Sequence, residues 1–114
     1  MIDLAPDVYR QRVIIEGTLD EKLEPEKMKE LLSKMCDSLD MVKLTDPVVN
    51  HCEEFGICAH MHWKTSGIHM YTWDNRDPIF FSIDIYTCKK FDVFDALLCV
   101  EQTINPRVMV HKDV

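Results

Sequence analysis

Hydrophobic residues recur at helical spacing in two segments of the chain. The first spacing predicts a helix that begins near Pro25, with an apolar stripe made of Met28, Leu31, Leu32, Met35 and Leu39. The second predicted helix has Asp92 as a candidate N-cap and ends before Asn105-Pro106. Its apolar side consists of Val93, Leu97, Val100 and Ile104.

Strand-like segments fill most of the remaining chain. Residues 9–19 surround a Val-Ile-Ile centre, residues 107–111 form a short last strand, and residues 43–53 form a weaker segment that Pro47 restricts to a sheet edge or a bulge. Between them, residues 56–88 alternate as three strands joined by the turns KTSG and DNRDP. This order predicts an α/β protein of the α+β type, with one domain over residues 1–114. We expect a two-layer sandwich in which a mostly antiparallel sheet carries both helices on one face.

The alternation assigns the side chains of the three central strands to two opposite faces of the sheet. We expect the helices to cover a face that includes Ile57, Met61, Phe81, Ile83 and Ile85. If Thr65-Ser66 is the centre of the first hairpin, Lys64 pairs with Gly67, so that His62 lies opposite His69 and His60 lies opposite Tyr71. The second face is too aromatic for a purely solvent-facing surface, and we expect it to stack against a second copy in a homodimer or to line a ligand site. It carries Cys58, His60, His62, His69, Tyr71, Trp73, Phe80, Asp84 and Tyr86.

Charge and cysteine content narrow the possible partners and the compartment. The net charge is −7 and there is no run of Lys or Arg, which disfavours nucleic acid and anionic membranes and is compatible with a small cationic ligand. No apolar run is long enough to span a bilayer. The five cysteines are odd in number and none has C-x-x-C spacing, so we expect a reduced cytoplasmic protein.

Three histidines on the second face raise the possibility of a metal site. His60 and His62 alternate along one predicted strand and His69 lies on the next, an arrangement that can supply three imidazoles to zinc or iron. The alternative is a hydrogen-bonded polar surface at a dimer interface. The spacing leaves both interpretations open.

Two motifs in the central strands resemble the small prokaryotic S-adenosylmethionine decarboxylases. That family has a segment like S-E-S-H-L-x-I-H-T-W-P-E, followed by a strand that ends D-[ILV]-[FY]-T-C. This chain has K-T-S-G-I-H-M-Y-T-W-D-N and then Ile83-Asp84-Ile85-Tyr86-Thr87-Cys88. A weaker resemblance extends over nearly the whole chain, with Gly56 before the processing strand, residues 12–16 like the family's opening strand and residues 106–108 like its closing one.

The resemblance implies a self-processing enzyme of polyamine (spermidine) biosynthesis. Such a precursor cuts its own backbone before a serine by an N→O acyl shift, and the serine becomes a pyruvoyl group that serves as electron sink when the substrate amino acid loses CO2. By position, cleavage falls between Thr65 and Ser66 and gives fragments 1–65 and 66–114. Ser66 is then the pyruvoyl precursor and Cys88 the proton donor. The implied substrate is S-adenosylmethionine or a related amino acid such as arginine or ornithine.

Several positions depart from the family pattern. Tyr71 stands where the family has its processing histidine, and the nearby His69 is the alternative source of an imidazole. Gly67 replaces the histidine that follows the serine at the cleavage site, and Cys58 replaces a serine that assists processing. In the segment Trp73-Asp74-Asn75, which the resemblance assigns to substrate binding, Asp74 replaces a proline and Asn75 a glutamate.

These departures leave three functions open. The chain is a pyruvoyl-dependent decarboxylase whose processing is slow, a non-catalytic relative that binds a small ligand or a partner chain, or a histidine-based metal protein. A phenol accepts a proton less readily than an imidazole at neutral pH. With Tyr71 at the processing position, we therefore expect self-cleavage to be slow or absent.

Overall fold

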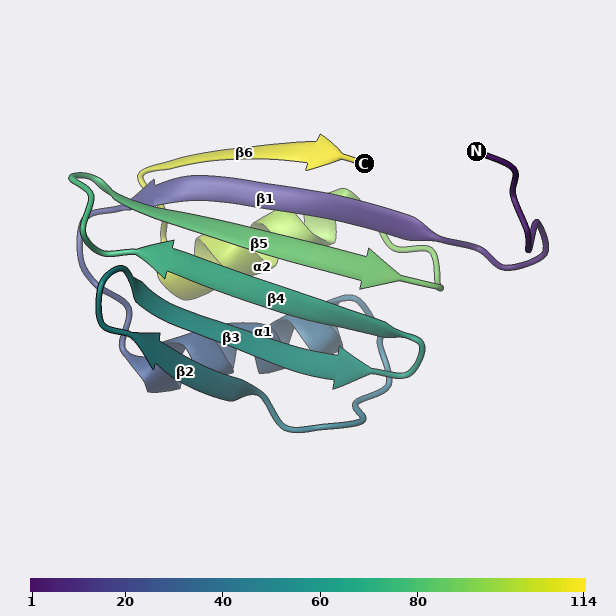
Figure 1. Cartoon of the computed structure of the whole chain (residues 1–114), viewed down its shortest axis with the longest axis horizontal. Coiled ribbons are helices and arrows are strands. Elements are labelled where there is room, and N and C mark those ends of the chain that lie inside the picture. Colours follow the sequence, from purple (N-terminus) through teal and green to yellow (C-terminus); the bar gives the residue numbers. More distant parts are fainter.

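Six strands form one antiparallel sheet in the computed structural model, which describes all 114 residues. The strands lie in the order β2-β3-β4-β5-β1-β6 (Figure 1). Their bounds are β1 Gln11–Leu19, β2 Val48–Cys52, β3 Gly56–Trp63, β4 Ser66–Trp73, β5 Ile79–Thr87 and β6 Val108–Asp113, and the helices are α1 Pro25–Ser38 and α2 Val93–Ile104. The predicted order of elements and the predicted α+β sandwich are confirmed.

Both helices cover the same face of the sheet, as predicted, and lie side by side behind it in Figure 1. Helix α1 begins at Pro25 and buries the whole predicted stripe. Asp92 caps α2, because its side chain accepts a hydrogen bond from the Phe94 amide at 2.9 Å. The predicted stripe of α2 is only partly right. Its most buried residues are Ala96, Cys99 and Val100, and Val93, Leu97 and Ile104 pack at the margin of the core.

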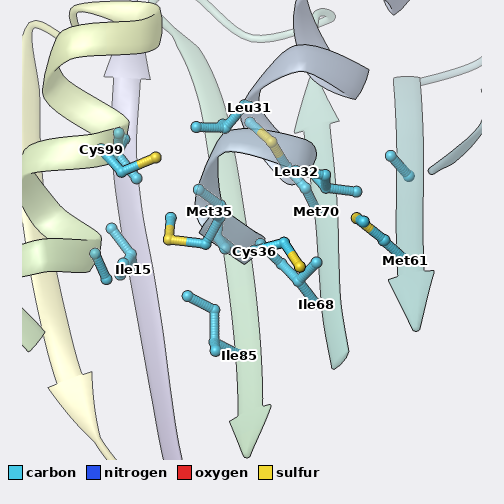
Figure 2. Close-up of a cluster of buried hydrophobic side chains, with 14 of the residues drawn as sticks. Ile15, Leu31, Leu32, Met35, Cys36, Met61, Ile68, Met70, Ile85 and Cys99 are labelled. Carbon is cyan, nitrogen blue, oxygen red and sulfur yellow. The ribbon is translucent and has the colours of Figure 1, made fainter. Parts of the chain in front are cut away.

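The core lies between the helices and the inner face of the sheet. Figure 2 shows Leu31, Leu32 and Met35 of α1 above the inward side chains of the central strands. The five inward residues predicted from alternation, Ile57, Met61, Phe81, Ile83 and Ile85, are all buried. Because the inner face is closed by this core, any site on the sheet must use its outer face or its edges. No helix in this structure combines the length and the apolar character that crossing a membrane requires.

The predicted centre of the β3–β4 hairpin was wrong by one residue. The turn consists of Lys64 and Thr65, Trp63 pairs with Ser66, His60 faces His69, and Gly67 lies opposite His62. Two hydrogen bonds explain the register. The Ser66 hydroxyl accepts from the Cys88 amide, which holds Ser66 in line with β5, and the Lys64 amide donates to the Val42 carbonyl.

The two edges of the sheet also differ slightly from the predicted segments. Only Val48–Cys52 of the predicted segment 43–53 forms the strand β2, and Lys43 makes an isolated bridge to Trp63. Pro47, which has no amide hydrogen, directly precedes this strand, and β2 is an edge strand as predicted. At the other edge, β6 begins one residue later than predicted and continues to Asp113.

Candidate functional site

Ser66 and Cys88 meet at one end of the sheet. Ser66 is the first residue of β4, and Cys88 directly follows the last residue of β5. Because β4 and β5 are antiparallel neighbours, the start of one lies beside the end of the other (Figure 1). The Ser66 hydroxyl oxygen accepts a hydrogen bond from the Cys88 backbone amide at 3.1 Å. The two residues that the sequence motifs single out are therefore in direct contact.

Thr65, the residue before Ser66, has a strained backbone. Its φ is 56°, in the left-handed region that a β-branched residue rarely adopts. Such a conformation costs on the order of 1–3 kcal/mol. Its hydroxyl donates a hydrogen bond to the Lys64 carbonyl at 2.7 Å. The strain lies directly beside the Thr65–Ser66 peptide bond.

An open cavity of about 540 Å³ adjoins this turn. Its floor follows a row across the outer face in which Gly67 lies between His62 and Tyr86, with Arg12 next in line. Glycine has no side chain, so the row leaves a hollow at its centre. The cavity is lined by Arg12, Leu44, His62, Trp63, Thr65, Ser66, Gly67, His69, Asp84 and Tyr86.

Arg12 and Asp84 form a two-pronged ion pair in this cavity. Arg12 Nε donates to Asp84 Oδ1 at 3.0 Å, and Arg12 Nη2 donates to Asp84 Oδ2 at 2.8 Å. The hydrogen bonds and charge of Asp84 raise the pKa of Arg12. Local sequence pattern does not identify this pair. Its only signal was that both residues occupy outward positions of strands, and the β1–β5 pairing that joins them could not be inferred from local pattern.

His69 lies in the cavity, whereas Tyr71 does not. His69 is three residues along β4 from Ser66 and faces Asp84 on β5. Tyr71 is five residues along the same extended strand, so its Cα lies about 17 Å from that of Ser66 at about 3.3 Å per residue. Within one chain, the structure places the imidazole nearer to Ser66 than the phenol.

The predicted substrate-binding residues lie at the opposite end of β4. Trp73 and Phe80 have ring centroids 5.2 Å apart and line a smaller cavity of about 250 Å³ with Arg76. Asp74 is partly buried, its Oδ1 has no hydrogen-bond partner, and its neighbour Asn75 is exposed. Within one chain, these residues are not brought together with Ser66.

The three histidines of the outer face do not converge on a point. The ring centroids of His60 and His62 are 6.1 Å apart, and those of His60 and His69 are 6.0 Å apart. The structure contains no group of three or more His, Cys, Asp or Glu residues placed to hold a metal ion. The geometry therefore does not support the interpretation of these residues as a metal site.

Comparison with known proteins agrees with the sequence motifs. The crystal structure of the adenosylmethionine decarboxylase from Aquifex aeolicus VF5 superposes with a TM-score of 0.73 and 17% identity, covering 94% of this chain and 89% of that chain. At this identity the likeness shows the fold alone. None of the curated protein sequences matches the chain. The family model described as S-adenosylmethionine decarboxylase, a family that uses a pyruvoyl group, matches residues 15–114. The chain therefore belongs to the S-adenosylmethionine decarboxylase family.

Proposed function

We propose that the protein is a pyruvoyl-dependent decarboxylase that acts in the cytoplasm on S-adenosylmethionine or a related amino acid such as arginine or ornithine, in polyamine biosynthesis. One observation carries the proposal beyond family membership. Ser66 and Cys88, which by position correspond to the family's pyruvoyl precursor and proton donor, come from different strands and are in hydrogen-bond contact. That contact puts the serine to be modified beside the residue that would complete turnover.

Three features of the β3–β4 turn favour formation of the pyruvoyl group from Ser66. The Thr65–Ser66 bond lies at an exposed two-residue turn. The left-handed φ of Thr65 destabilises the uncleaved chain. The Cys88 amide holds the Ser66 hydroxyl oxygen in place. In the proposed reaction this oxygen attacks the Thr65 carbonyl carbon, and the acyl group moves from nitrogen to oxygen. A base then takes the α-proton of residue 66, and the ester leaves as the carboxylate of Thr65. The remaining dehydroalanine takes up water and loses ammonia, which gives the pyruvoyl group.

We assign the role of base to His69 of the same chain. It shares the cavity with Ser66, as does His62 opposite Gly67, and it lies on the strand that Ser66 begins. Tyr71 lies about 17 Å away along that strand at about 3.3 Å per residue. His69 is itself about 10 Å along β4 from Ser66 at the same rise. A general base must come within hydrogen-bond reach of the proton that it takes, so this separation makes self-cleavage slow.

Cys88 is proposed to deliver the proton that completes turnover. The residue is half-buried directly after β5, and its backbone amide holds the Ser66 oxygen. The pyruvoyl group, once formed, withdraws electrons from the bound amino acid as CO2 leaves. The thiol then protonates the substrate carbon that lost the carboxylate.

Intact mass spectrometry combined with a CO2-release assay tests the proposal. Incubated wild-type protein is expected to give fragments 1–65 and 66–114 together with CO2 release from S-adenosylmethionine. Ser66→Ala is expected to give neither, while Ser33→Ala, on helix α1 in the other layer, behaves as wild type. Decarboxylation by an uncleaved Ser66→Ala protein would refute the pyruvoyl mechanism.

A second candidate function is a non-catalytic relative that binds a small ligand or a partner chain. The loss of both family histidines favours it, because Gly67 and Tyr71 occupy their positions. This alternative predicts a permanently uncleaved chain that binds S-adenosylmethionine without releasing CO2.

We further propose that two copies associate through their outer sheet faces. This face carries Tyr71 and Tyr86 with exposed fractions of 43% and 44%, and Tyr71 lies beside Trp73, whose ring pairs with that of Phe80. Helices cover only the opposite face. A second copy is the partner that would remove these aromatic rings from water.

A further inference from the structure

Asp84 and Arg12 supply the carboxylate and the guanidinium of the Ser66 cavity. Among its ten lining residues, Asp84 is the only carboxylate and Arg12 the only lysine or arginine. The side chain of Asp84 is 33% exposed and that of Arg12 is 42% exposed. The pair is therefore in the cavity and accessible, and neither the family motifs nor the proposed processing reaction assigns it a role.

The position of Asp84 relative to Ser66 is set by the strand register. Gly67, next to Ser66, lies opposite Tyr86 on β5, and Asp84 is two residues further along that strand, opposite His69. Asp84 thus lies about 10 Å from the Ser66 end, at about 3.3 Å per residue. A substrate whose amine is held at residue 66 would extend its side chain over the Gly67 hollow toward Asp84.

Asp84 retains the capacity to bind a second cation. Each of its two oxygens accepts one hydrogen bond from Arg12. A carboxylate oxygen has two lone pairs, so an acceptor site remains on each oxygen. The aromatic ring of Tyr86, opposite Arg12 and Gly67, offers a cation a second favourable surface.

We propose that Asp84 is a specificity-determining residue that receives the positively charged side chain of the ligand, and that Arg12 holds this carboxylate while the site is empty and competes with the ligand for it. The class of ligand rests on the proposed function, since S-adenosylmethionine, arginine and ornithine all carry a cation beyond their α-amine. The assignment explains how the chain recognises that cation although Trp73 and Asn75 lie at the far end of β4.

Calorimetric binding to the Ser66→Ala protein tests the proposal without any reaction. The probes form two matched pairs, S-adenosylmethionine with its uncharged thioether S-adenosylhomocysteine, and arginine with citrulline. The measured quantity is the preference for the cation within each pair. Asp84→Asn should lower this preference roughly three- to fivefold, as expected for a partly exposed charge pair. Arg12→Gln should raise it by a similar factor, because the carboxylate loses its competitor.

Glu30→Gln is the matched control. It also removes a carboxylate held by basic side chains, Lys27 and Lys34, but lies on α1 in the other layer. The Glu30→Gln variant should prefer the cationic probe of each pair as strongly as the parent Ser66→Ala protein does. Thermal unfolding of each variant checks that the fold is retained.

Two outcomes would overturn the inference. One is a cation preference that Asp84→Asn leaves unchanged, and the other is a parent protein that prefers neither cationic probe to its neutral partner. The proposed decarboxylase function is judged separately from the cleavage and CO2 release of the wild-type chain. If the wild-type chain cleaves itself but Asp84→Asn leaves the cation preference unchanged, this inference alone is refuted. If the wild-type chain stays uncleaved but Asp84→Asn lowers the cation preference, the catalytic function alone is refuted.

Discussion

The hydroxyl oxygen of Ser66 accepts a hydrogen bond from the backbone amide of Cys88 at 3.1 Å, across 22 positions of sequence. The contact depends on the Cys88 main chain and not on its thiol. The two proposed roles of this end of the sheet can therefore be separated by mutation, since changing the thiol leaves the amide that positions Ser66 in place.

Cys88→Ala is expected to cleave at the wild-type rate but to turn over at least about 100-fold more slowly, because it removes only the proton donor. Cleavage is followed by mass spectrometry and turnover by CO2 release. Cys52→Ala, which removes an exposed thiol on β2, is the control and should alter neither rate. Unchanged turnover in Cys88→Ala would exclude the thiol as proton donor.

Thr65→Gly is expected to slow cleavage and to stabilise the fold. Glycine adopts a φ of 56° without the strain that threonine carries there. Relief of the strain, less the added freedom of the unfolded chain, should raise the free energy of unfolding by about 1 kcal/mol. Urea titration measures this change. Faster cleavage in Thr65→Gly would show that strain at this bond does not assist processing.

The base is identified by two substitutions on β4. His69→Ala should abolish the cleavage seen in the wild type, because it removes the imidazole proposed as the base. Tyr71→His restores the family's imidazole but places it about 17 Å along the strand at about 3.3 Å per residue, so within one chain it should not replace His69. Cleavage that persists in His69→Ala and accelerates in Tyr71→His would place the base at residue 71 of a second copy.

Association through the outer sheet face is tested by light scattering at micromolar concentration. The wild type should have the mass of a dimer, and Tyr71→Glu should be monomeric because it places a charge among the aromatic rings of that face. Phe94→Glu is the control, since Phe94 is an aromatic residue of α2 that is 75% exposed on the other layer. A monomeric wild type would rule out the proposed dimer.

Alkaline pH should destabilise the fold through two buried thiols. Burial raises the pKa of both Cys36 and Cys99 above the ordinary value of 9.0. Above that value the unfolded chain releases these protons first, so the stability that they contribute is fully present below pH 9 and is lost as pH rises toward the folded-state pKa values. The free energy of unfolding should therefore fall above about pH 9. The fall should be shallower in the Cys36→Ala/Cys99→Ala protein, and an equally steep fall in both proteins would contradict this cause.

The sequence predicted what depends on local pattern and missed what depends on distant pairing. The stripe from Met28 to Leu39 and the alternation of Phe81, Ile83 and Ile85 each follow from a period within one element, and both predictions were confirmed. The predicted hairpin register was wrong because the turn consists of Lys64 and Thr65, with Thr65 at a positive φ that a β-branched residue rarely adopts.

In the candidate site, too, residues in local motifs were predicted and residues joined by distant strand pairing were not. Ser66 and Cys88 were found through motifs, and the contact between them follows from the antiparallel neighbours β4 and β5. Arg12 and Asp84 lie on different strands, 72 positions apart in the sequence, and no local pattern indicates that these strands pair. Chemistry carried by one strand could thus be inferred from the sequence, but a cavity wall contributed by β1 could not.

The most direct test of Ser66 as the processing site is the intact mass of the wild-type chain followed over days at neutral pH. Freshly purified protein should be mostly one species of 13.4 kDa, and a minor pair of fragments, 1–65 and 66–114, should grow slowly with time and be absent from Ser66→Ala. The second fragment should carry a ketone in place of its terminal amine. A chain that stays at full length throughout, or one that is cut at any other bond, would contradict the assignment of Ser66.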